Sequence, residues 1–415
     1  MKFYLMAFLL LAGAARAEIR VAFPAERQKL PSVEQTYVIG SVDPGRTELL
    51  YVNGVTTDVY RTGAFLSMVA VEPGTNTLTF VRGRERLVRT FVVADPPKAR
   101  SPLAARVPPK PIESDDDPRL GAEGAWRTTG SLFMNRVREA PDAGDTLFFL
   151  PKDFVLRGAA VAGTRWVAVW LEGRRGFLPK KVLAAHPMKT PPSKALVAPD
   201  ICAGFADRPP YGRRPEDVRI CVDAGHGGSD PGALSPHGWK EKDVNLLQAQ
   251  AIQAALEKAG FQVLMTRSDD SFPALVDRPL KAYNAHVDAL ISVHHNATAP
   301  HRDPRLARHT TTYAATSNGL ALARCIQKHV GKVLSPVKDA GAQMKSLAVC
   351  RNPAVPSCLI EVDFINLPEG EAESWNPVRQ RLVAQAVVCG VLDWMTPPLD
   401  TTPVEIPTVP VPENP

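Results

Sequence analysis

Several features that mark common classes of protein are absent from this sequence. No Cys-x-x-Cys pair occurs, and all six cysteines lie between Cys202 and Cys389, so a metal site built from thiolates has little support. No dense basic cluster or basic motif interleaved with aromatic residues occurs, which leaves nucleic-acid binding without support. Beyond the first residues, no segment is long and apolar enough to cross a bilayer.

Proline, in contrast, is abundant and unevenly distributed. The 415 residues include 39 prolines, and these occur in clusters. Such clusters predict stiff linkers between folded domains. A chain of this length also exceeds what one compact core usually holds, so two to four domains are expected. The clusters predict linkers at residues 96–120 and 187–216, and a disordered tail at 398–415.

The first 17 residues have the pattern of an export signal. Lys2 supplies a positive start, residues 3–12 form an apolar run, and Ala15-Arg16-Ala17 forms a small-x-small cleavage site. The run is shorter than the roughly 17–20 residues that span a bilayer, which disfavours the alternative of a membrane anchor. No cysteine follows the run, which argues against a lipoprotein. We therefore expect an exported protein, in the periplasm in preference to the extracellular cell wall.

Two stretches predict small all-β modules. Residues 18–95 alternate apolar and polar positions between turn signals such as Asn53-Gly54, the pattern of an antiparallel β-sandwich. They resemble the immunoglobulin-like modules of exported bacterial enzymes. Residues 121–186, with a strand centred on Trp166 and a later Gly176-Phe177, resemble a bacterial SH3-like barrel. For this barrel, binding of wall peptides and service as a spacer are both open.

Residues 217–397 have a different pattern, in which short apolar strands alternate with helical stretches. This alternation predicts an α/β domain whose mostly parallel sheet is flanked by helices and whose functional residues lie at the carboxyl ends of strands. The chain is thus predicted to be multidomain, with two small all-β modules before a C-terminal α/β catalytic domain. The predicted strands are 219–223, 261–266, 289–293, 310–314 and 358–364, and the predicted helices are 244–259, 275–286, 318–334 and 378–394.

Four residues stand where such a domain would place its chemistry. His226 follows the first strand, Glu241 begins the first helix, His294 ends the third strand and Glu361 lies in the late strand. Two histidines and a carboxylate form a known catalytic zinc set that leaves a position for water. A further glutamate can take a proton from that water. Each residue alone also has an ordinary structural role, since a glutamate at a helix start, for example, pairs with the helix dipole.

The four residues lie within a series of longer motifs. These are 222–233 around His226, 240–245 around Glu241, Thr266-Arg267, Arg278, Asn284, 292–297 around His294, and 359–361 with Phe364. In this order and spacing, the motifs resemble the zinc-dependent N-acetylmuramoyl-L-alanine amidases of bacterial cell-wall turnover, of the amidase_3 type.

The resemblance implies a role for each residue. It makes His226, Glu241 and His294 the ligands of one zinc ion per catalytic domain and Glu361 the catalytic carboxylate, whereas His295 is not a ligand. The implied reaction is hydrolysis of the amide between N-acetylmuramic acid and L-alanine of peptidoglycan. Zinc would polarise the carbonyl while Glu361 moves the proton. Such an enzyme would act in wall turnover, remodelling and cell separation.

The sequence departs from the family in three places. Asp363 stands where glycine is usual, and Leu367 stands where asparagine is common. We expect Asp363 to face the same side of its strand as Glu361 and to raise the pKa of Glu361; the alternative is a solvated carboxylate at the strand end. Only a short segment separates Asn296 from the next predicted strand, so the long helical insert that plugs regulated division amidases is not expected.

Other interpretations stay open at this stage. Another zinc hydrolase of the wall, such as a peptidase or a sugar deacetylase, and a non-catalytic wall-binding protein that keeps the fold both fit the pattern. The N-terminal modules could bind a protein activator in place of the wall. Cys350 and Cys358 flank a proline-containing loop and are the first pair to test for a disulfide. No pattern singles out substrate-binding residues or an oligomeric state.

Overall fold

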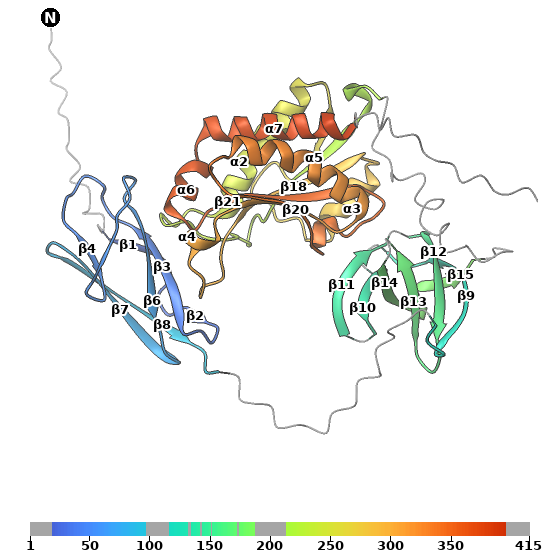
Figure 1. Cartoon of the computed structure of the whole chain (residues 1–415), viewed down its shortest axis with the longest axis horizontal. Helices are drawn as coiled ribbons and strands as arrows, with labels where there is room; N and C mark the ends of the chain where they lie inside the picture. The colour runs from blue at the N-terminus through green and yellow to red at the C-terminus, as the bar shows by residue number, and fades with distance from the viewer. Residues whose placement is uncertain are drawn as a thin grey trace, which may run out of the picture.

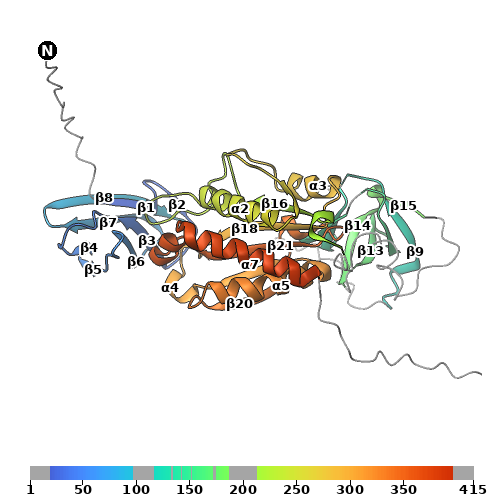
Figure 2. The same cartoon turned by 90° about the horizontal axis from the view of Figure 1, so that it is seen from above.

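The computed structural model describes most of the chain in three folded parts. The described residues are 19–96, 116–131, 134–141, 143–150, 152–171, 174–186 and 213–395. The predicted export signal, most of each predicted linker, the predicted tail and Cys202 lie outside them. Figures 1 and 2 show two β-rich parts with the α/β part between them in space. The prediction of a multidomain chain with all-β parts before a C-terminal α/β domain is confirmed.

Residues 19–96 form two sheets around one core. Side chains from both sheets, including Val38, Phe65 and Phe80, are buried together. The pairing of β2 with β8 is parallel, so the predicted antiparallel pairing does not hold at this edge. One sheet has the order β1 (Arg20–Phe23), β3 (Gln35–Ser41), β6 (Ala64–Ala70), and the other β2 (Lys29–Leu30), β8 (Glu85–Val93), β7 (Gly74–Arg82), β4 (Leu50–Val52), β5 (Val55–Thr57).

The Asn53-Gly54 pair shows how local sequence sets this fold. It forms the two-residue loop between β4 and β5, whose strands pair from Val52 and Val55 outward. Both loop residues have positive φ, 50° for Asn53 and 80° for Gly54. Tight hairpins favour turns of this kind because their twist matches that of the strands, and Asn-Gly tolerates the left-handed backbone.

The second β-rich part, residues 116–186, is a single sheet of seven strands with antiparallel pairing. Its interior holds Leu156, Val167 and Leu178, all fully buried. The sheet order is β11 (Ala143–Phe149), β10 (Arg136–Ala140), β14 (Arg174–Pro179), β13 (Trp166–Leu171), β12 (Val155–Val161), β9 (Leu120–Thr128), β15 (Leu183–Ala185), with the 3-10 turn η1 (Lys180–Val182) between β14 and β15.

The α/β part contains a six-stranded sheet. All its pairings are parallel except that of β19 with β21, which are antiparallel. β16, β18 and β21 lie side by side in the middle of the sheet, so residues at their carboxyl ends come together. The order is β17 (Gln262–Met265), β16 (Arg219–Ala224), β18 (Ala289–Asn296), β21 (Ser357–Phe364), β19 (Thr310–Ala314), β20 (Asp339–Met344).

Helices cover both faces of this sheet. Three long helices, α2 (Glu241–Lys258), α5 (Ser317–Val333) and α7 (Pro377–Met395), pack on one face over the largest apolar core of the chain's described part (Figure 1). The other face carries α3 (Asp277–Asn284) and the turn η3 (Ala348–Cys350) over a smaller core. Within the described ranges, no helix combines the length and apolar character needed to cross a membrane.

Each strand and helix predicted for the α/β part has an observed counterpart, but one strand and two α-helices were not predicted. The edge strand β20 has a polar, glycine-containing sequence that carries little β signal. The short helices α4 (Pro304–Ala307) and α6 (Pro368–Ser374) each begin with proline after a strand. α4 is the only helix in the segment between β18 and β19, which is described throughout.

The first β-rich part is docked on the α/β part. Tyr37, Ile39 and Leu66 share an apolar cluster with Phe364 and Leu367 of the α/β part. The backbone N–H of Tyr37 donates to the carbonyl of Pro300 at 2.9 Å. Leu367, which replaces the asparagine common in the family, is therefore buried by the neighbouring domain.

The second β-rich part contacts a different loop of the α/β part. The backbone N–H of Phe149 donates to the carbonyl of Arg351 at 3.0 Å, and the Arg351 guanidinium lies 5.7 Å from the centroid of the Phe149 ring. The Ser346 hydroxyl donates to the carbonyl of Leu147 at 3.1 Å. The end of strand β11 thus sits on the segment that precedes β21.

Replacing Leu66 by alanine tests the first of these contacts. Loss of a buried leucine side chain costs about 2–5 kcal/mol of stability. Because Leu66 packs against Leu367, which caps α6, we expect faster amide hydrogen exchange in α6 as well as a lower Tm. Val88→Ala is the control, since Val88 lies in the same domain but is 47% exposed. Unchanged exchange in α6 of the Leu66→Ala protein would show that the two domains are not coupled by this contact.

Candidate active site

His226 lies in a tight turn directly after β16. Its φ is 59°, a left-handed backbone conformation that is uncommon for residues other than glycine, and Gly227 and Gly228 also have positive φ. Arg278 of α3 stabilises the turn by donating to the carbonyl of Ala224 at 2.7 Å and to that of His226 at 2.8 Å. The turn therefore presents the His226 side chain at the edge of the sheet.

A buried carboxylate holds Arg278 in place. Asp223 accepts hydrogen bonds from Arg278 at 2.9 Å, from the Thr266 hydroxyl at 2.5 Å and from the Ser292 hydroxyl at 2.6 Å. Burial opposes ionisation of Asp223, but the charge of Arg278 and the two hydroxyl donors outweigh it, so the pKa of Asp223 is lowered. Thr266 and Arg278 both occur in the sequence motifs. Thr266 helps to hold Asp223, which holds Arg278, and Arg278 bonds the His226 turn.

Glu241 is the first residue of α2, and its carboxylate is almost fully buried. Its Oε2 accepts from the N–H of Ala233 at 2.9 Å, and its Oε1 accepts from Asn245 at 3.0 Å. Burial opposes ionisation of Glu241, yet hydrogen bonds to His226 and His294 lower its pKa well below the usual value. The side chain is therefore an anion held in one orientation.

His226 and His294 both approach this carboxylate. Nε2 of His226 and Nδ1 of His294 each lie 3.1 Å from Oε1 of Glu241. The donor atoms of all three residues lie within 4.8 Å of one another. Glycine is required at position 225 because a Cβ there would lie 2.2 Å from Nε2 of His294. The structure thus brings together the three residues that the sequence placed on separate elements.

Asp230 orients the first histidine. Its Oδ2 lies 2.7 Å from Nδ1 of His226, which leaves Nε2 of that ring for Glu241. Burial alone would lower the pKa of His226, but hydrogen bonds to Glu241 and Asp230 raise it to about 9. A histidine whose second nitrogen bonds a carboxylate is the usual arrangement around a protein-bound metal. Asp230 lies in the sequence motif around His226, but the motif alone did not indicate this role.

The donor set fits zinc. Two imidazole nitrogens and one carboxylate are the ligands of several catalytic zinc sites, and they leave a fourth position open. The ligand atoms here converge on one point and are already oriented by Asp230, Ala233 and Asn245. Because histidine must lose its proton to bind a metal, loading would compete with protonation of His226.

Glu361 lies beside this group. It pairs in register with His294 on the neighbouring strand. Its Oε2 is buried without a hydrogen-bond partner among the described residues. Burial, assisted by the nearby Glu241 and opposed by His294, raises the pKa of Glu361 to about 7. A carboxylate with this pKa can both accept and donate a proton near neutral pH.

Two residues near Glu361 were not found by sequence analysis. Tyr313 and Lys345 both interact electrostatically with Glu361, and Lys345 lowers its pKa. The Lys345 ammonium also lies 4.5 Å from the centroid of the Tyr313 ring. Lys345 follows the weakly patterned strand β20, so no motif pointed to it.

The surroundings of Asp363 contradict the prediction of a solvated carboxylate. It is fully buried and lies 2.8 Å from Nη2 of Arg308 and 2.9 Å from Nη2 of Arg379. Burial opposes its ionisation, but Arg308 and Arg379 lower its pKa. It is therefore not a solvated carboxylate, and the raised pKa of Glu361 comes first from burial. The register between β18 and β21 shifts just after Glu361, so simple alternation does not place Asp363 on the same side.

His295 and two cysteines are structural. The His295 ring is buried with Nδ1 2.8 Å from Oδ1 of Asn245, and burial lowers its pKa to about 4. Cys350 and Cys358, the pair chosen for a disulfide test, are free and buried. Burial raises the pKa of both thiols, so they remain protonated.

Replacing Asp363 by asparagine tests whether this residue stabilises the fold or tunes the pKa of Glu361. Loss of one partner from a buried ion pair costs about 3–5 kcal/mol, so we expect a lower free energy of unfolding. The pH dependence of activity should keep its midpoint, because Asp363 is neutralised by Arg308 and Arg379. A shift of that midpoint would restore the expectation that Asp363 tunes Glu361.

The effect of Asp363→Asn on the free energy of unfolding should depend on pH. Because the folded pKa of Asp363 is depressed, its stabilising effect is present above its unfolded pKa and is lost as the pH falls through its folded pKa. The difference between wild type and Asp363→Asn in denaturant unfolding should therefore shrink in acid. Asp153→Asn, at an exposed ion pair with Arg127, is the control and should show little difference at either pH.

Comparisons with known proteins concern the α/β part. Residues 220–393 match the family model described as N-acetylmuramoyl-L-alanine amidase. The chain is 34% identical over 188 residues to a probable cell wall amidase, LytH, of Staphylococcus saprophyticus, covering 45% of this chain and 61% of that protein. It is 33% identical over 174 residues to LytH of Staphylococcus aureus, covering 41% and 56%. The chain thus spans less than two thirds of either relative.

A solved structure is also similar. The N-acetylmuramoyl-L-alanine amidase from Clostridium difficile 630 is 32% identical, with 43% of this chain and 96% of that chain covered and a TM-score of 0.40.

Proposed function

Residues 220–393 of this chain belong to the N-acetylmuramoyl-L-alanine amidase family, and on this premise we propose that the protein is an exported, zinc-dependent hydrolase of peptidoglycan. Its reaction is hydrolysis of the amide that joins N-acetylmuramic acid to L-alanine. His226, Glu241 and His294 hold the zinc ion, and Glu361 is the catalytic carboxylate. The family and the cell-wall names of the relatives support the reaction, and the export pattern of residues 1–17 supports action in the periplasm or at the wall.

One observation carries this proposal. Three metal-ligating side chains from three separate elements converge within 4.8 Å, next to a buried glutamate whose pKa is raised to about 7. A wall-binding protein without catalysis has no need for Glu361, whose Oε2 lacks any partner among the residues described. The unpartnered oxygen is suited to a proton-transfer step, because a water or leaving group can supply its missing hydrogen bond.

The residues of this chain divide the chemistry among them. A bound zinc ion supplies Lewis-acid chemistry, polarising the scissile carbonyl and lowering the pKa of water. Asp230 and Glu241 fix the two imidazole rings, so the ligand set is formed before substrate arrives. Glu361 accepts a proton from the attacking water and delivers it to the L-alanine nitrogen as the amide breaks.

Digestion of peptidoglycan by the purified protein tests the reaction. We expect release of peptides with a free L-alanine amino group and intact glycan strands, abolished by a chelator and restored by zinc, with products identified by mass spectrometry. Free amino groups on the sugars would indicate a deacetylase, and cleavage within the peptide would indicate a peptidase. Intact peptidoglycan in the presence of zinc-loaded protein would contradict hydrolysis by this chain alone.

Two substitutions separate metal binding from proton transfer. Glu361→Gln should keep zinc and lose about 10²–10⁴-fold in kcat, the usual contribution of general acid–base catalysis. His294→Ala should lose both zinc and activity, because it removes one of three protein ligands. Metal content by mass spectrometry and kcat are the readouts, and Glu257→Gln, on the exposed face of α2, is the control. Zinc lost from Glu361→Gln would make Glu361 a ligand.

The pH profile tests the role of Glu361 further. Glu361 must be ionised to accept a proton, so kcat/KM should fall as the pH drops through its pKa. That midpoint lies near 7 without metal, and the positive charge of zinc shifts it downward. An acidic limb with its midpoint above about pH 8 would exclude Glu361 as the group that titrates.

A further inference from the structure

Lys345 is an exposed lysine near the candidate catalytic glutamate. Its positive charge acts on the carboxylate of Glu361, so the two groups lie within electrostatic reach of each other. In the parts of the chain that the structure describes, no carboxylate forms an ion pair with Lys345. An ammonium group that borders a catalytic site and has no protein counter-ion is available to an anionic group of the substrate.

The ring of Tyr313 holds the Lys345 side chain on the same face of the sheet as Glu361. The ammonium lies 4.5 Å from the ring centroid, within the range of a cation–π contact. On the antiparallel strands β19 and β21, Tyr313 pairs with Leu359. Two residues away along both strands, Thr311 pairs with Glu361. Because paired residues point to one side of a sheet and side chains alternate along a strand, the Tyr313 ring and the Glu361 carboxylate share a face.

The backbone on both sides of Lys345 is fixed. The N–H of Lys345 donates to the carbonyl of Ala314 at 2.7 Å, at the end of β19. The hydroxyl of the next residue, Ser346, accepts from Nε of Arg351 at 3.0 Å and donates to the carbonyl of Leu147 in the second β-rich part at 3.1 Å. A lysine pays rotamer entropy when it binds a ligand, and a fixed backbone with an aromatic contact reduces that cost.

The substrate of the proposed reaction offers one group that matches this cation. The stem peptide begins with L-alanine, and its second residue is a glutamate linked onward through its side chain. The carboxylate on the Cα of that glutamate is free in one form of the polymer and amidated in another. Consecutive Cα atoms are ~3.8 Å apart, so this group lies one residue beyond the L-alanine nitrogen to which Glu361 delivers its proton.

We propose that Lys345 binds the free carboxylate of the second stem-peptide residue and selects peptides in which this group is not amidated. The inference rests on the proposed function, because the carboxylate belongs to the substrate of that reaction. The stem peptide then runs from Glu361 across Tyr313 toward the second β-rich part. The alternative, that Lys345 acts only by tuning Glu361, predicts no distinction between the two forms of the peptide.

Two soluble ligands that differ in one group test the proposal. In both, N-acetylmuramic acid is joined through its amide to L-alanine and a second residue, which carries either the free carboxylate or its amide. The zinc-loaded full chain gives kcat/KM for each ligand. Isothermal titration gives Kd for each in a Glu361→Gln background, in which turnover is too slow to consume the ligands.

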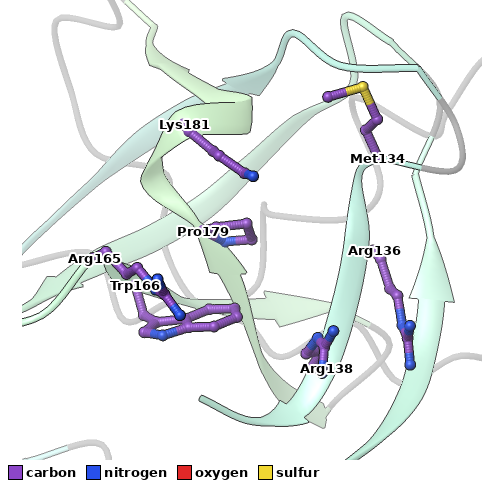
Figure 3. Close-up of a pocket in the computed structure, with 7 residues that line it drawn as sticks. All are labelled: Met134, Arg136, Arg138, Arg165, Trp166, Pro179 and Lys181. Carbon is purple, nitrogen blue, oxygen red and sulfur yellow. The ribbon is translucent and has the colours of Figure 1, made fainter. Parts of the chain in front are cut away.

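The two variants each remove one positive charge. Lys345→Met keeps a flexible apolar side chain against Tyr313. The control is Lys181→Met, in the second β-rich part, where Lys181 lines a separate cation-rich pocket of about 520 Å³ (Figure 3). The control therefore shows whether the ligand carboxylate binds at that pocket. Matching Tm values for the two variants exclude unfolding as the cause of weaker binding.

We expect the wild-type chain to prefer the carboxylate ligand by about tenfold or more in kcat/KM and in Kd, the usual effect of a charged hydrogen bond. Lys345→Met should lose this preference and Lys181→Met should keep it. An equal loss with both ligands in Lys345→Met overturns the proposal, as does a preference that Lys345→Met keeps or that the control loses.

The titration separates this contact from the proposed function, because binding is measured without turnover. A chain that binds the carboxylate ligand selectively through Lys345 but leaves its L-alanine amide intact would refute the proposed reaction and leave the contact standing. Equal Kd values of wild type for the two ligands, together with hydrolysis of both, would refute the contact alone.

Discussion

The geometry of the candidate site depends on the buried ion pair between Asp223 and Arg278. Both side chains are almost completely removed from water and lie 2.9 Å apart. Burial of two charges costs several kcal/mol per ion unless further hydrogen bonds satisfy them. Here Thr266 and Ser292 satisfy the carboxylate, and the carbonyls of Ala224 and His226 accept from the guanidinium. Because Arg278 is held by Asp223 and bonds the carbonyls of Ala224 and His226, the ion pair fixes the position of the His226 turn.

The ion pair in turn positions the three candidate metal ligands. The turn places His226 against Glu241, whose position is set by the first turn of α2, and His294 completes the group from the end of β18. Each of these three candidate ligands comes from a different element, and each has a second hydrogen bond or a close contact that limits its rotamers. Sites built in this way lose little free energy to reorganisation when a metal binds.

The sequence predicted what depends on local pattern. Strands β16 and β18 each contain a short apolar run, residues 220–222 and 289–291. The candidate residues lie in or next to the carboxyl-terminal halves of strands or at a helix start, so their convergence followed from the topology of a parallel sheet. Simple alternation could not place Asp363, because the register between β18 and β21 shifts after Glu361. β20 was not predicted because an edge strand is stabilised by its neighbour more than by its own residues. The presence of leucine at position 367 could not be explained from nearby sequence, because residues that bury it lie in another domain.

Both β-rich parts contact segments next to the candidate catalytic residues. The first contacts Pro300, in the segment that follows His294 along the chain, and the second contacts Ser346 and Arg351, in the segment that precedes Glu361. These segments are short and lack long helices of their own, so their conformation depends on the surfaces that cover them. The two β-rich parts therefore cover loops of the α/β part. A substitution at either contact can thereby alter the position of His294 or Glu361 while leaving the sheet itself unchanged.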